Sequence, residues 1–346
     1  MHSTVEKIAI YGATGHTGRF VVQEAESRGL PVVAVGRSGA RLEETMPPGV
    51  ERRVAALDDP ESLDRAFAGC SLVVNCAGPF LETAAPVTAA ALRSRCHSMD
   101  VTAEQASARA SFDDFDAPAR AAGRAVVPAA GFYGGLADLL ATALAPQGKI
   151  DEITVAVGLD RWWPTEGTRR TGERNTVPRV VVKEGRLAPL EPGAAVPDWT
   201  FGPPLGRQPM VEIPLSEIVT LHRHLEAATI RSLMNRSALD DLRNATTPPP
   251  TAVDSFGRSA QRFEMAVRVE RNGEIRTGGA RGQDIYAVTA PIVIEAALHL
   301  LAPSYRRSGA LALAEAVPPV ELLRGLKGSA LELFGDLLAT IPEVEE

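Results

Sequence analysis

The stretch IAIYGATGHTGRFVVQEAESRG, residues 8–29, has an apolar start, glycines at positions 12, 15 and 18, and a helical pattern after them. We expect a short strand, a tight turn and a helix that ends at Gly29. Glycine is needed where the backbone turns sharply and where it approaches a pyrophosphate, and the helix N-terminus offers free N–H groups to phosphates. The stretch therefore predicts a dinucleotide-binding turn, the alternative being a structural turn without a ligand. The predicted cofactor-binding residues of the turn are Gly12, Ala13, Thr14, Gly15, His16, Thr17 and Gly18.

The residues after the second predicted strand favour NADP(H) as the cofactor. PVVAV (31–35) is followed by Gly36, Arg37 and Ser38, whereas a site for NAD usually has an acidic residue there for the ribose 2′-hydroxyl. The Arg37 guanidinium can pair with a 2′-phosphate, and the Ser38 hydroxyl can add a hydrogen bond. The alternative is that Arg37 is a solvated loop charge.

Strands and helices continue to alternate as far as residue 132, which predicts an α/β fold of Rossmann type with a doubly wound parallel sheet. The further predicted strands are ERRVAAL (51–57), SLVVNCAGPF (71–80), CHSMDVT (96–102) and RAVVPAAGF (124–132). Ligands of such sheets bind at the carboxyl ends of the strands. Residues at or just after the ends of the third and fourth strands therefore join the predicted cofactor contacts: Asp58, Asn75, Ala77, Gly78 and Pro79.

The composition limits the class of protein. The chain of 346 residues is 45% hydrophobic and has a formal net charge of −7, which argues against nucleic acid or an anionic membrane as the main partner. No apolar stretch has the length of a membrane-spanning helix and none resembles a signal peptide, so we expect a cytoplasmic protein. The three cysteines lack metal-ligand spacing, and we predict no metal site.

The pattern changes near residue 150, where alternating segments predict a second domain of mainly antiparallel strands. Asn272-Gly273 suits a tight hairpin turn between two of these strands. The segment EAATIRSLMN (226–235) is assigned as a helix. The predicted strands are DEITVAVGL (151–159), RVVVKEGRLAPL (179–190), MVEIPLSEIVTLHRHL (210–225) and RFEMAVRVERNGEIRTGGARG (262–282).

Several phrases are shared with a known family. GATGHTGRFV, VVNCAGPF, MDVTAE and AVVPAAGFYGGLADLLA near the N-terminus, with GQDIYAVTAPIVIEAALHLL and GALALAEAVPPVELLRGL near the C-terminus, resemble the saccharopine dehydrogenase-like oxidoreductases, of the saccharopine reductase and trans-acting enoyl reductase type. The resemblance implies hydride transfer between NAD(P)H and a C=N or activated C=C bond. Two departures lie near the expected substrate: Ala103-Glu104 replaces a frequent Gly-Glu, and the segment 135–138 (GLAD) replaces a frequent Pro-Ser-Asp.

The resemblance also implies the division of the chain. Residues 1–145 and about 286–346 would form the NADP-binding Rossmann domain. Residues from about 146 to 285 would form an inserted α+β domain for substrate binding and dimerisation. We expect a small-molecule substrate, free or bound to a carrier protein, no nucleic acid or membrane partner, and a homodimer.

Hydride transfer needs a proton donor or a group that polarises the acceptor. No tyrosine has a lysine four residues later, so the Tyr-x-x-x-Lys pair of short-chain dehydrogenases is missing. Tyr133, directly after the sixth predicted strand, is the best remaining donor; the alternative is a tyrosine that packs at the domain junction. Asp100 and Glu104 follow the fifth strand and are further catalytic candidates, with helix capping as their alternative.

Three residues of the second domain are candidates for substrate binding. Trp162 and Arg170 lie in DRWWPTEGTRRTGERNT (160–176), which predicts either a lid over the site or a surface loop at an interface. His222 and His224 are two apart in a predicted strand and would face the same side. His222 is therefore a candidate substrate contact.

These observations predict an NADPH-dependent reductase of an imine or conjugated alkene in a small molecule, in a biosynthetic pathway. An enzyme acting on a C–OH/C=O pair is an alternative within the same fold. A different class is an NADP-binding sensor of the NmrA-like type without catalysis, which the missing Tyr-x-x-x-Lys pair permits. The large second domain favours the enzyme.

Overall fold

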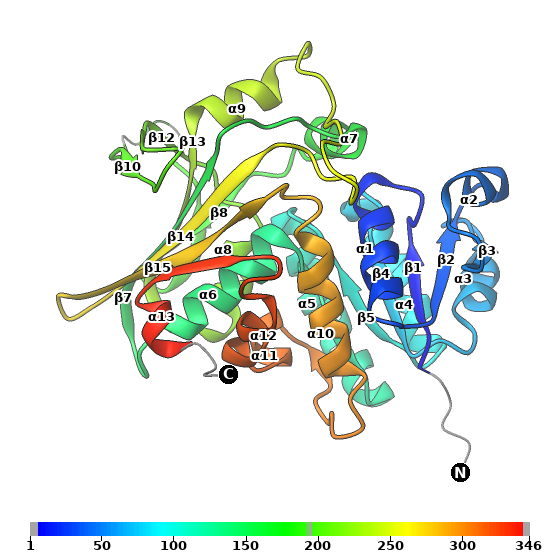
Figure 1. Cartoon of the computed structure of the whole chain (residues 1–346). Helices are drawn as coiled ribbons and strands as arrows, with labels where there is room; N and C mark the ends of the chain where they lie inside the picture. Colours follow the sequence, from blue (N-terminus) through cyan, green and yellow to red (C-terminus); the bar gives the residue numbers. More distant parts are fainter. Residues whose placement is uncertain (1–5, 192, 194–195, 342–346) are drawn as a thin grey trace, which may run out of the picture.

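The computed structural model describes residues 6–191, 193 and 196–341. Within these residues the chain forms a seven-stranded sheet, an eight-stranded sheet and a small two-stranded sheet. Figure 1 shows the first sheet with its helices on the right and the second sheet on the left, with helices between them.

The first sheet is parallel throughout and confirms the predicted Rossmann-type arrangement. Its spatial order is β16 (Gly309–Ala310), β6 (Ala125–Val127), β5 (His97–Asp100), β4 (Leu72–Asn75), β1 (Ile8–Tyr11), β2 (Val32–Gly36) and β3 (Glu51–Val54). The order reverses next to β1, which lies between β2 and β4. Ligands of open parallel sheets bind at this point.

Helices cover both faces of this sheet because its central strands are buried on both sides. Alternate residues of β1 belong to different cores: Ile8 and Ile10 pack with α1 and α2, whereas Ala9 and Tyr11 pack with α3 and α4. The helices around the sheet are α1 (His16–Ser27), α2 (Gly39–Thr45), α3 (Pro60–Phe67), α4 (Phe80–Arg93), α5 (Gln105–Ala122) and α10 (Thr289–Leu300).

The second sheet is mixed. At its centre β7 pairs in parallel with β13 and antiparallel with β14. The order is β17 (Glu332–Gly335), β15 (Glu274–Gln283), β14 (Arg262–Arg271), β7 (Ile150–Leu159), β13 (Ala227–Asn235), β8 (Val180–Lys183) and β9 (Arg186–Pro189), with β12 (Met210–Glu212) also paired to β13. The predicted hairpin is confirmed: Asn272 and Gly273, between β14 and β15, both have positive φ, of 51° and 79°. The separate pair is β10 (Trp199–Thr200) and β11 (Arg207–Gln208).

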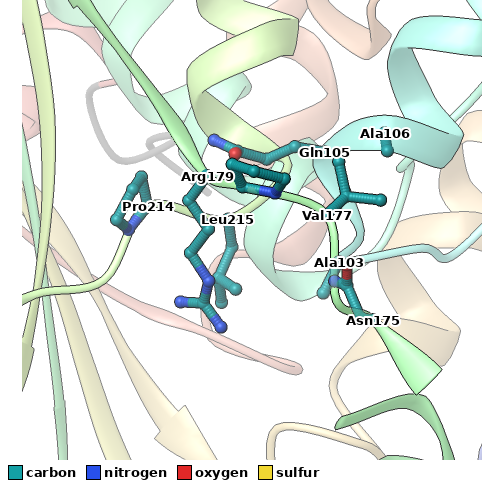
Figure 2. Close-up of a pocket in the computed structure, with 9 residues that line it drawn as sticks. Ala103, Gln105, Ala106, Asn175, Val177, Arg179, Pro214 and Leu215 are labelled. Carbon is teal, nitrogen blue, oxygen red and sulfur yellow. The ribbon is translucent and has the colours of Figure 1, made fainter. Parts of the chain in front are cut away.

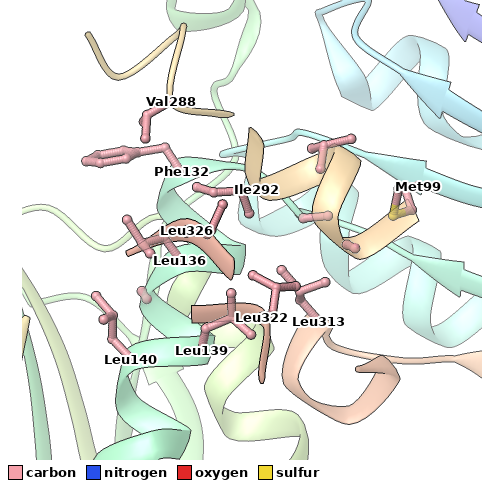
Figure 3. Close-up of a cluster of buried hydrophobic side chains, with 14 of the residues drawn as sticks. Met99, Phe132, Leu136, Leu139, Leu140, Val288, Ile292, Leu313, Leu322 and Leu326 are labelled. Carbon is pink, nitrogen blue, oxygen red and sulfur yellow. The ribbon is translucent and has the colours of Figure 1, made fainter. Parts of the chain in front are cut away.

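The remaining helices join the two sheets. They are a π-helix η1 (Phe132–Leu136), α6 (Ala137–Leu144), α7 (Glu166–Arg174), α8 (Glu217–His224), α9 (Arg236–Arg243), α11 (Leu313–Ala316), α12 (Pro319–Leu326) and α13 (Leu337–Thr340). Figure 3 shows Leu136 and Leu140 in one buried cluster with Ile292 of α10 and Leu322 of α12. This cluster also contains residues of β1 and of β7, so one continuous core joins both sheets.

Two predictions for the middle of the chain are wrong. EAATIRSLMN forms strand β13, because pairing with β7 and β8 outweighs the helix propensity of its alanines. The predicted strand over residues 210–225 splits into β12 and helix α8, in which the spacing of Ile218, Leu221 and Leu225 places them on one apolar face. His222 and His224 therefore lie on a helix and do not share a strand face.

The end of the predicted domain division also needs a correction. The segment from residue 286 returns to the first sheet through α10 and β16, as the resemblance implies. However, β17 pairs with β15 of the second sheet over residues 332–335. This antiparallel pairing to β15 at the edge of the second sheet holds residues 332–335 with the second domain.

A buried ion pair holds α6, α8 and α11 together. Asp138 is fully buried; its Oδ1 lies 2.6 Å from His224 Nε2, and its Oδ2 accepts a hydrogen bond of 2.7 Å from Ala314 N. Burial lowers the pKa of His224, but the hydrogen bond and charge of Asp138 outweigh it, and the net pKa is raised from 6.5. The stabilising effect of this protonation is therefore complete below pH 6.5 and is lost as the pH rises through the raised pKa.

We predict that His224→Gln, which can keep a neutral hydrogen bond, lowers the free energy of unfolding by about 1 kcal/mol in acid, because a charge-assisted bond is about twice as strong as a neutral one. The loss should shrink above about pH 8. Urea unfolding in acid and above about pH 8 measures this loss of stability. His222→Gln is the control, because burial lowers the pKa of His222, whereas that of His224 is raised. An equal loss for His224→Gln at both pH values contradicts the prediction.

Candidate functional site

The glycine turn between β1 and α1 has no room for side chains. Gly12 has φ +80°, and a Cβ on it would lie 2.8 Å from Ala77 Cβ and 2.9 Å from Ala77 N. A Cβ on Gly18 would lie 2.2 Å from Gly12 O, and one on Gly15 would lie 3.1 Å from the same atom. Glycine at these positions thus permits β1, the turn and the end of β4 to lie in direct backbone contact.

The N-terminus of α1 is suited to hold phosphates. Its N-cap residue is Gly15, which has no side chain to cap the helix. The backbone N–H groups of His16, Thr17 and Gly18 have no acceptor among the described residues. Unpaired amides at the positive end of a helix dipole fit a pyrophosphate, so the residues present match the predicted dinucleotide.

The predicted adenosine contacts lie beside the turn. Burial raises the pKa of the Tyr11 hydroxyl, while the charge of Arg37 lowers it and that of Asp58 raises it, so these side chains are neighbours. The Arg37 side chain is exposed, and within the described part of the chain it has no hydrogen bond or ion pair. Ser38 is the N-cap of α2 and accepts a hydrogen bond of 3.3 Å from Arg41 N. A free guanidinium at the end of β2 is available to a 2′-phosphate.

The predicted cofactor contacts after β4 form a turn whose backbone is held by the side chain of a buried asparagine. The buried Asn75 accepts a hydrogen bond of 3.0 Å from Ala77 N and donates one of 3.1 Å to Thr83 Oγ1. The peptide bond between Gly78 and Pro79 is cis. Asn75 thus orients the backbone of this turn, and Ala77 is the residue of the turn that lies against Gly12.

In the structure, the carboxylates of Glu104 and Asp100 accept hydrogen bonds from backbone amides of the first domain. Both Glu104 oxygens accept hydrogen bonds from the first amides of α4, 2.7 Å from Phe80 N and 3.3 Å from Leu81 N. Burial raises the pKa of this carboxyl, and the two hydrogen bonds oppose the rise. Asp100 Oδ1 accepts hydrogen bonds from Thr102 N and Ala129 N, at 3.0 and 2.9 Å. Burial raises the pKa of Asp100 to about 6. Glu104 therefore caps a helix, as its alternative assignment had it, and Asp100 fixes the backbone between β6 and η1.

Helix α7 of the second domain lies against the turn after β4. A Cβ on Gly78 would lie 3.1 Å from Thr171 Oγ1, and Arg174 forms an ion pair with Glu82 of α4. The segment predicted as a lid or a surface loop is thus partly helical and contacts the first domain. Arg170 is exposed and pairs with Glu166 on the same helix.

An aromatic network connects α7 to the glycine turn. Trp162 is 5% exposed, and its Nε1 donates a hydrogen bond of 3.0 Å to the Tyr286 hydroxyl. That hydroxyl also lies 2.9 Å from Thr168 Oγ1 of α7. The Tyr286 ring meets His16 edge to face at 5.3 Å. Trp162 therefore belongs to a wall that encloses the turn.

Three buried polar atoms that lack a hydrogen-bond partner among the described residues belong to side chains grouped next to this wall. Tyr133 OH, Arg179 Nη1 and Glu217 Oε2 are buried and form no hydrogen bond within the described residues. Burial raises the pKa of Glu217, raises that of Tyr133 well above 10 and lowers that of Arg179, and their charges act on one another. Unpaired buried polar groups are costly, so such a cluster indicates a ligand site. We call these residues the polar trio.

A narrow cleft opens beside Arg179. Its volume is about 10 Å³, and it lies between residues 103–106 after β5, residues 175–179 before β8 and residues 214–215 before α8. Figure 2 shows the Arg179 side chain running beside Leu215, with its guanidinium pointing away from Gln105. The Gln105 side chain exchanges two hydrogen bonds with the Val180 backbone, 2.8 and 2.9 Å long. The segment after β5 thus fixes the strand that holds Arg179.

The third predicted substrate residue, His222, lies apart from these groups. It has no hydrogen bond, ion pair or ring contact in the part of the chain that the structure describes, and burial lowers its pKa. Over the same residues no group of three His, Cys, Asp or Glu side chains suits a metal ion. No described helix is long and apolar enough to cross a membrane.

Comparisons with known proteins agree with this geometry. A family model described as NAD(P)H-binding matches residues 12–109. A probable mitochondrial saccharopine dehydrogenase-like oxidoreductase of Arabidopsis thaliana is 31% identical over 145 residues, which cover 37% of this chain and 32% of that protein. A saccharopine dehydrogenase-like oxidoreductase of Rattus norvegicus is 25% identical over 118 residues, or 28% of each chain.

Over these segments the chain is similar to the saccharopine dehydrogenase-like oxidoreductases. The match spans about a third of the length of these curated relatives. The solved structure of saccharopine dehydrogenase (L-Glu forming) from Saccharomyces cerevisiae aligns with 95% of this chain and 99% of its own, with a TM-score of 0.64 and 14% identity. At that identity the similarity shows a shared fold, which includes both domains.

Sequence reasoning missed Arg179, Glu217 and Tyr286. Glu217 stands in the otherwise apolar segment PLSEIVTL, and an isolated charge in an apolar segment is a signal of a buried functional group. Arg179 and Tyr286 have no comparable sequence signal. Their proximity to Tyr133 comes from the tertiary fold.

We predict that Gly15→Val abolishes binding of NADPH and NADH, because its side chain would occupy the path of the phosphates, while the protein stays folded. Equilibrium dialysis measures affinity, and circular dichroism checks the fold. Gly167→Val on α7, where a Cβ would have no neighbour closer than 3.7 Å, is the matched control. Dinucleotide affinity retained in Gly15→Val places the site elsewhere.

Proposed function

We propose that this protein is an oxidoreductase that uses NADPH to reduce a C=N or activated C=C bond of a small molecule. The observation that supports the cofactor is the uncapped α1 N-terminus next to the unpaired Arg37. The relationship to saccharopine dehydrogenase-like oxidoreductases supports the reaction class. A biosynthetic role and a substrate bound to a carrier protein belong to the same proposal.

Bound NADPH would supply a hydride to the acceptor. The residues that would hold it are the amides of α1, Arg37 and the turn from Ala77 to Pro79. The aromatic wall of Trp162 and Tyr286 would exclude water from the reacting atoms, which strengthens electrostatic interactions there.

The polar trio would recognise and protonate the substrate. The Tyr133 hydroxyl is protonated at neutral pH, and burial raises its pKa further. It can therefore donate a hydrogen bond to the reduced group, and a proton once charge develops there. The buried Arg179 guanidinium suits a carboxylate. Glu217 Oε2 can accept a hydrogen bond from an amine or hydroxyl.

Asp100 and Glu104 act in this proposal as positioning residues. Glu104 fixes the start of α4 below the cofactor turn, and Asp100 fixes the backbone that leads to Tyr133. Arg170, which pairs with Glu166 on α7, and His222 remain candidates for substrate contact in this proposal, without a role in proton transfer.

A sensor of the NmrA-like type would bind the dinucleotide without turnover. The polar trio favours catalysis, because a sensor has no need for unpaired buried groups beside the cofactor. We also retain as proposals a homodimer, which light scattering tests, and a cytoplasmic location. The free thiols of Cys70, Cys76 and Cys96 are compatible with a reducing compartment.

We predict that Arg37→Ala weakens NADPH binding at least about tenfold and leaves NADH binding nearly unchanged, since a charge-assisted pair with the 2′-phosphate contributes about 1.5–3 kcal/mol. Fluorescence titration with both nucleotides measures the effect. Arg109→Ala, an exposed arginine of α5 paired with Asp113, is the control. An equal loss for both nucleotides would remove the NADP assignment.

We predict that Tyr133→Phe lowers the turnover number at least about a hundredfold and leaves the dissociation constant of NADPH unchanged, since proton donation contributes about 10²–10⁴ to the rate. The assay is NADPH oxidation with a panel of imines and enoyl compounds. The same panel applied to Glu217→Gln should raise KM more than it lowers kcat. Unchanged turnover in Tyr133→Phe excludes it as the proton donor.

A further inference from the structure

A second, larger cavity lies at the opposite edge of the first sheet. Its volume is about 400 Å³, within the range of small-molecule sites. The residues that line it lie before or at the start of β1, β4, β5 and β6, or at the end of α10 and after it, so the cavity opens at the amino ends of the strands. In Figure 1 this edge is the lower one, where the loop after α10 lies. The glycine turn is at the upper edge.

The cavity carries an excess of positive charge. Arg95, Arg124 and Arg306 line it, and the carboxylate among its lining residues is that of Glu6. None of the three guanidinium groups forms an ion pair with a described residue. Arg306 donates only to the carbonyls of Pro303 and Tyr305.

Two buried polar atoms at the cavity lack partners. Arg124 Nε and Tyr305 OH are buried, and neither forms a hydrogen bond within the described residues. Burial raises the pKa of Tyr305 to about 12, so its hydroxyl stays protonated at neutral pH. Both atoms are therefore unused donors at the wall of an arginine-lined cavity, an arrangement that needs an explanation.

His97 adds a third donor of fixed orientation. It is 6% exposed, its Nδ1 accepts a hydrogen bond of 3.0 Å from Ala125 N, and its ring packs edge to face on Tyr305 at 5.5 Å. Burial, with the charge of Arg124, lowers the pKa of His97 to about 4. The neutral ring at pH 7 therefore carries its proton on Nε2, where it can donate.

We propose that this cavity is a second ligand site, which binds a small polyanion that carries phosphate or several carboxylate groups. Three guanidinium groups match oxyanions in charge and in hydrogen-bond geometry. Arg124, His97 and Tyr305 provide the buried donors, and the exposed Arg95 and Arg306 complete the mouth. The ligand would not touch the glycine turn, so the site is independent of the proposed reaction.

The test is isothermal titration of the whole protein with inorganic pyrophosphate and, separately, with citrate, at constant ionic strength set with sodium chloride. We expect saturable binding of at least one anion. Arg124→Gln should weaken it at least tenfold. Arg95→Gln, an exposed position, provides a second variant whose fold is not at risk. Pyrophosphate alone would indicate a phosphate ligand, and citrate alone a carboxylate ligand.

Two matched variants locate the binding. Arg109→Gln removes the same charge outside the cavity, and Gly15→Val blocks the amides at the α1 N-terminus, which also fit a pyrophosphate; both should keep the binding that Arg124→Gln loses. No binding beyond that of chloride overturns the proposal. So does a loss in Gly15→Val without a loss in Arg124→Gln and Arg95→Gln, because the anion would then occupy the dinucleotide site.

Discussion

The backbone contact between the glycine turn and the end of β4 is the constraint on which the candidate site depends. A Cβ on Gly12 would clash with Ala77, and one on Gly18 would clash with Gly12 itself. Only because these side chains are missing can α1 start directly behind β1, with its free amides at the carboxyl ends of β1 and β4. The rest of the first domain supports this turn: Asn75 orders the backbone on one side, and Glu104 caps α4 next to it.

A short segment after β5 holds the second domain to the first. Ser216 donates from its backbone to Ala103 O at 3.1 Å and from its hydroxyl to Thr102 O at 2.9 Å. Gln105 pairs with β8 in the same region. These contacts place two elements of the second domain beside Tyr133: α8, which contains Glu217, and the start of β8, which follows Arg179. They thus assemble the polar trio from three distant parts of the chain. Thr171 and Arg174 of α7 add a contact to the turn after β4 and to α4.

The sequence was informative where structure is local. Strand, glycine turn and helix stand within residues 8–29, and the alternation of the next hundred residues follows from periodicity, so the first sheet was predictable. Asn272-Gly273 determined its hairpin in the same way. Prediction failed at β13, because the segment EAATIRSLMN became a central strand through pairing that no local pattern shows. It also failed at α8, where a helix stands in a segment predicted as a strand. The geometry of the glycine turn likewise follows from the motif. The polar trio does not, because Arg179 and Glu217 meet Tyr133 only through the packed domains, and the arginine-lined cavity likewise gathers residues from five separate segments.

The central claim is that the glycine turn and Arg37 form a site for NADPH. The most direct measurement is titration of the purified protein with NADPH and with NADH, followed by nucleotide fluorescence. The account predicts saturable binding of NADPH with an affinity at least about tenfold higher than that of NADH, the difference expected for one charge-assisted pair. Equal affinity for both nucleotides, or binding of neither, would contradict it.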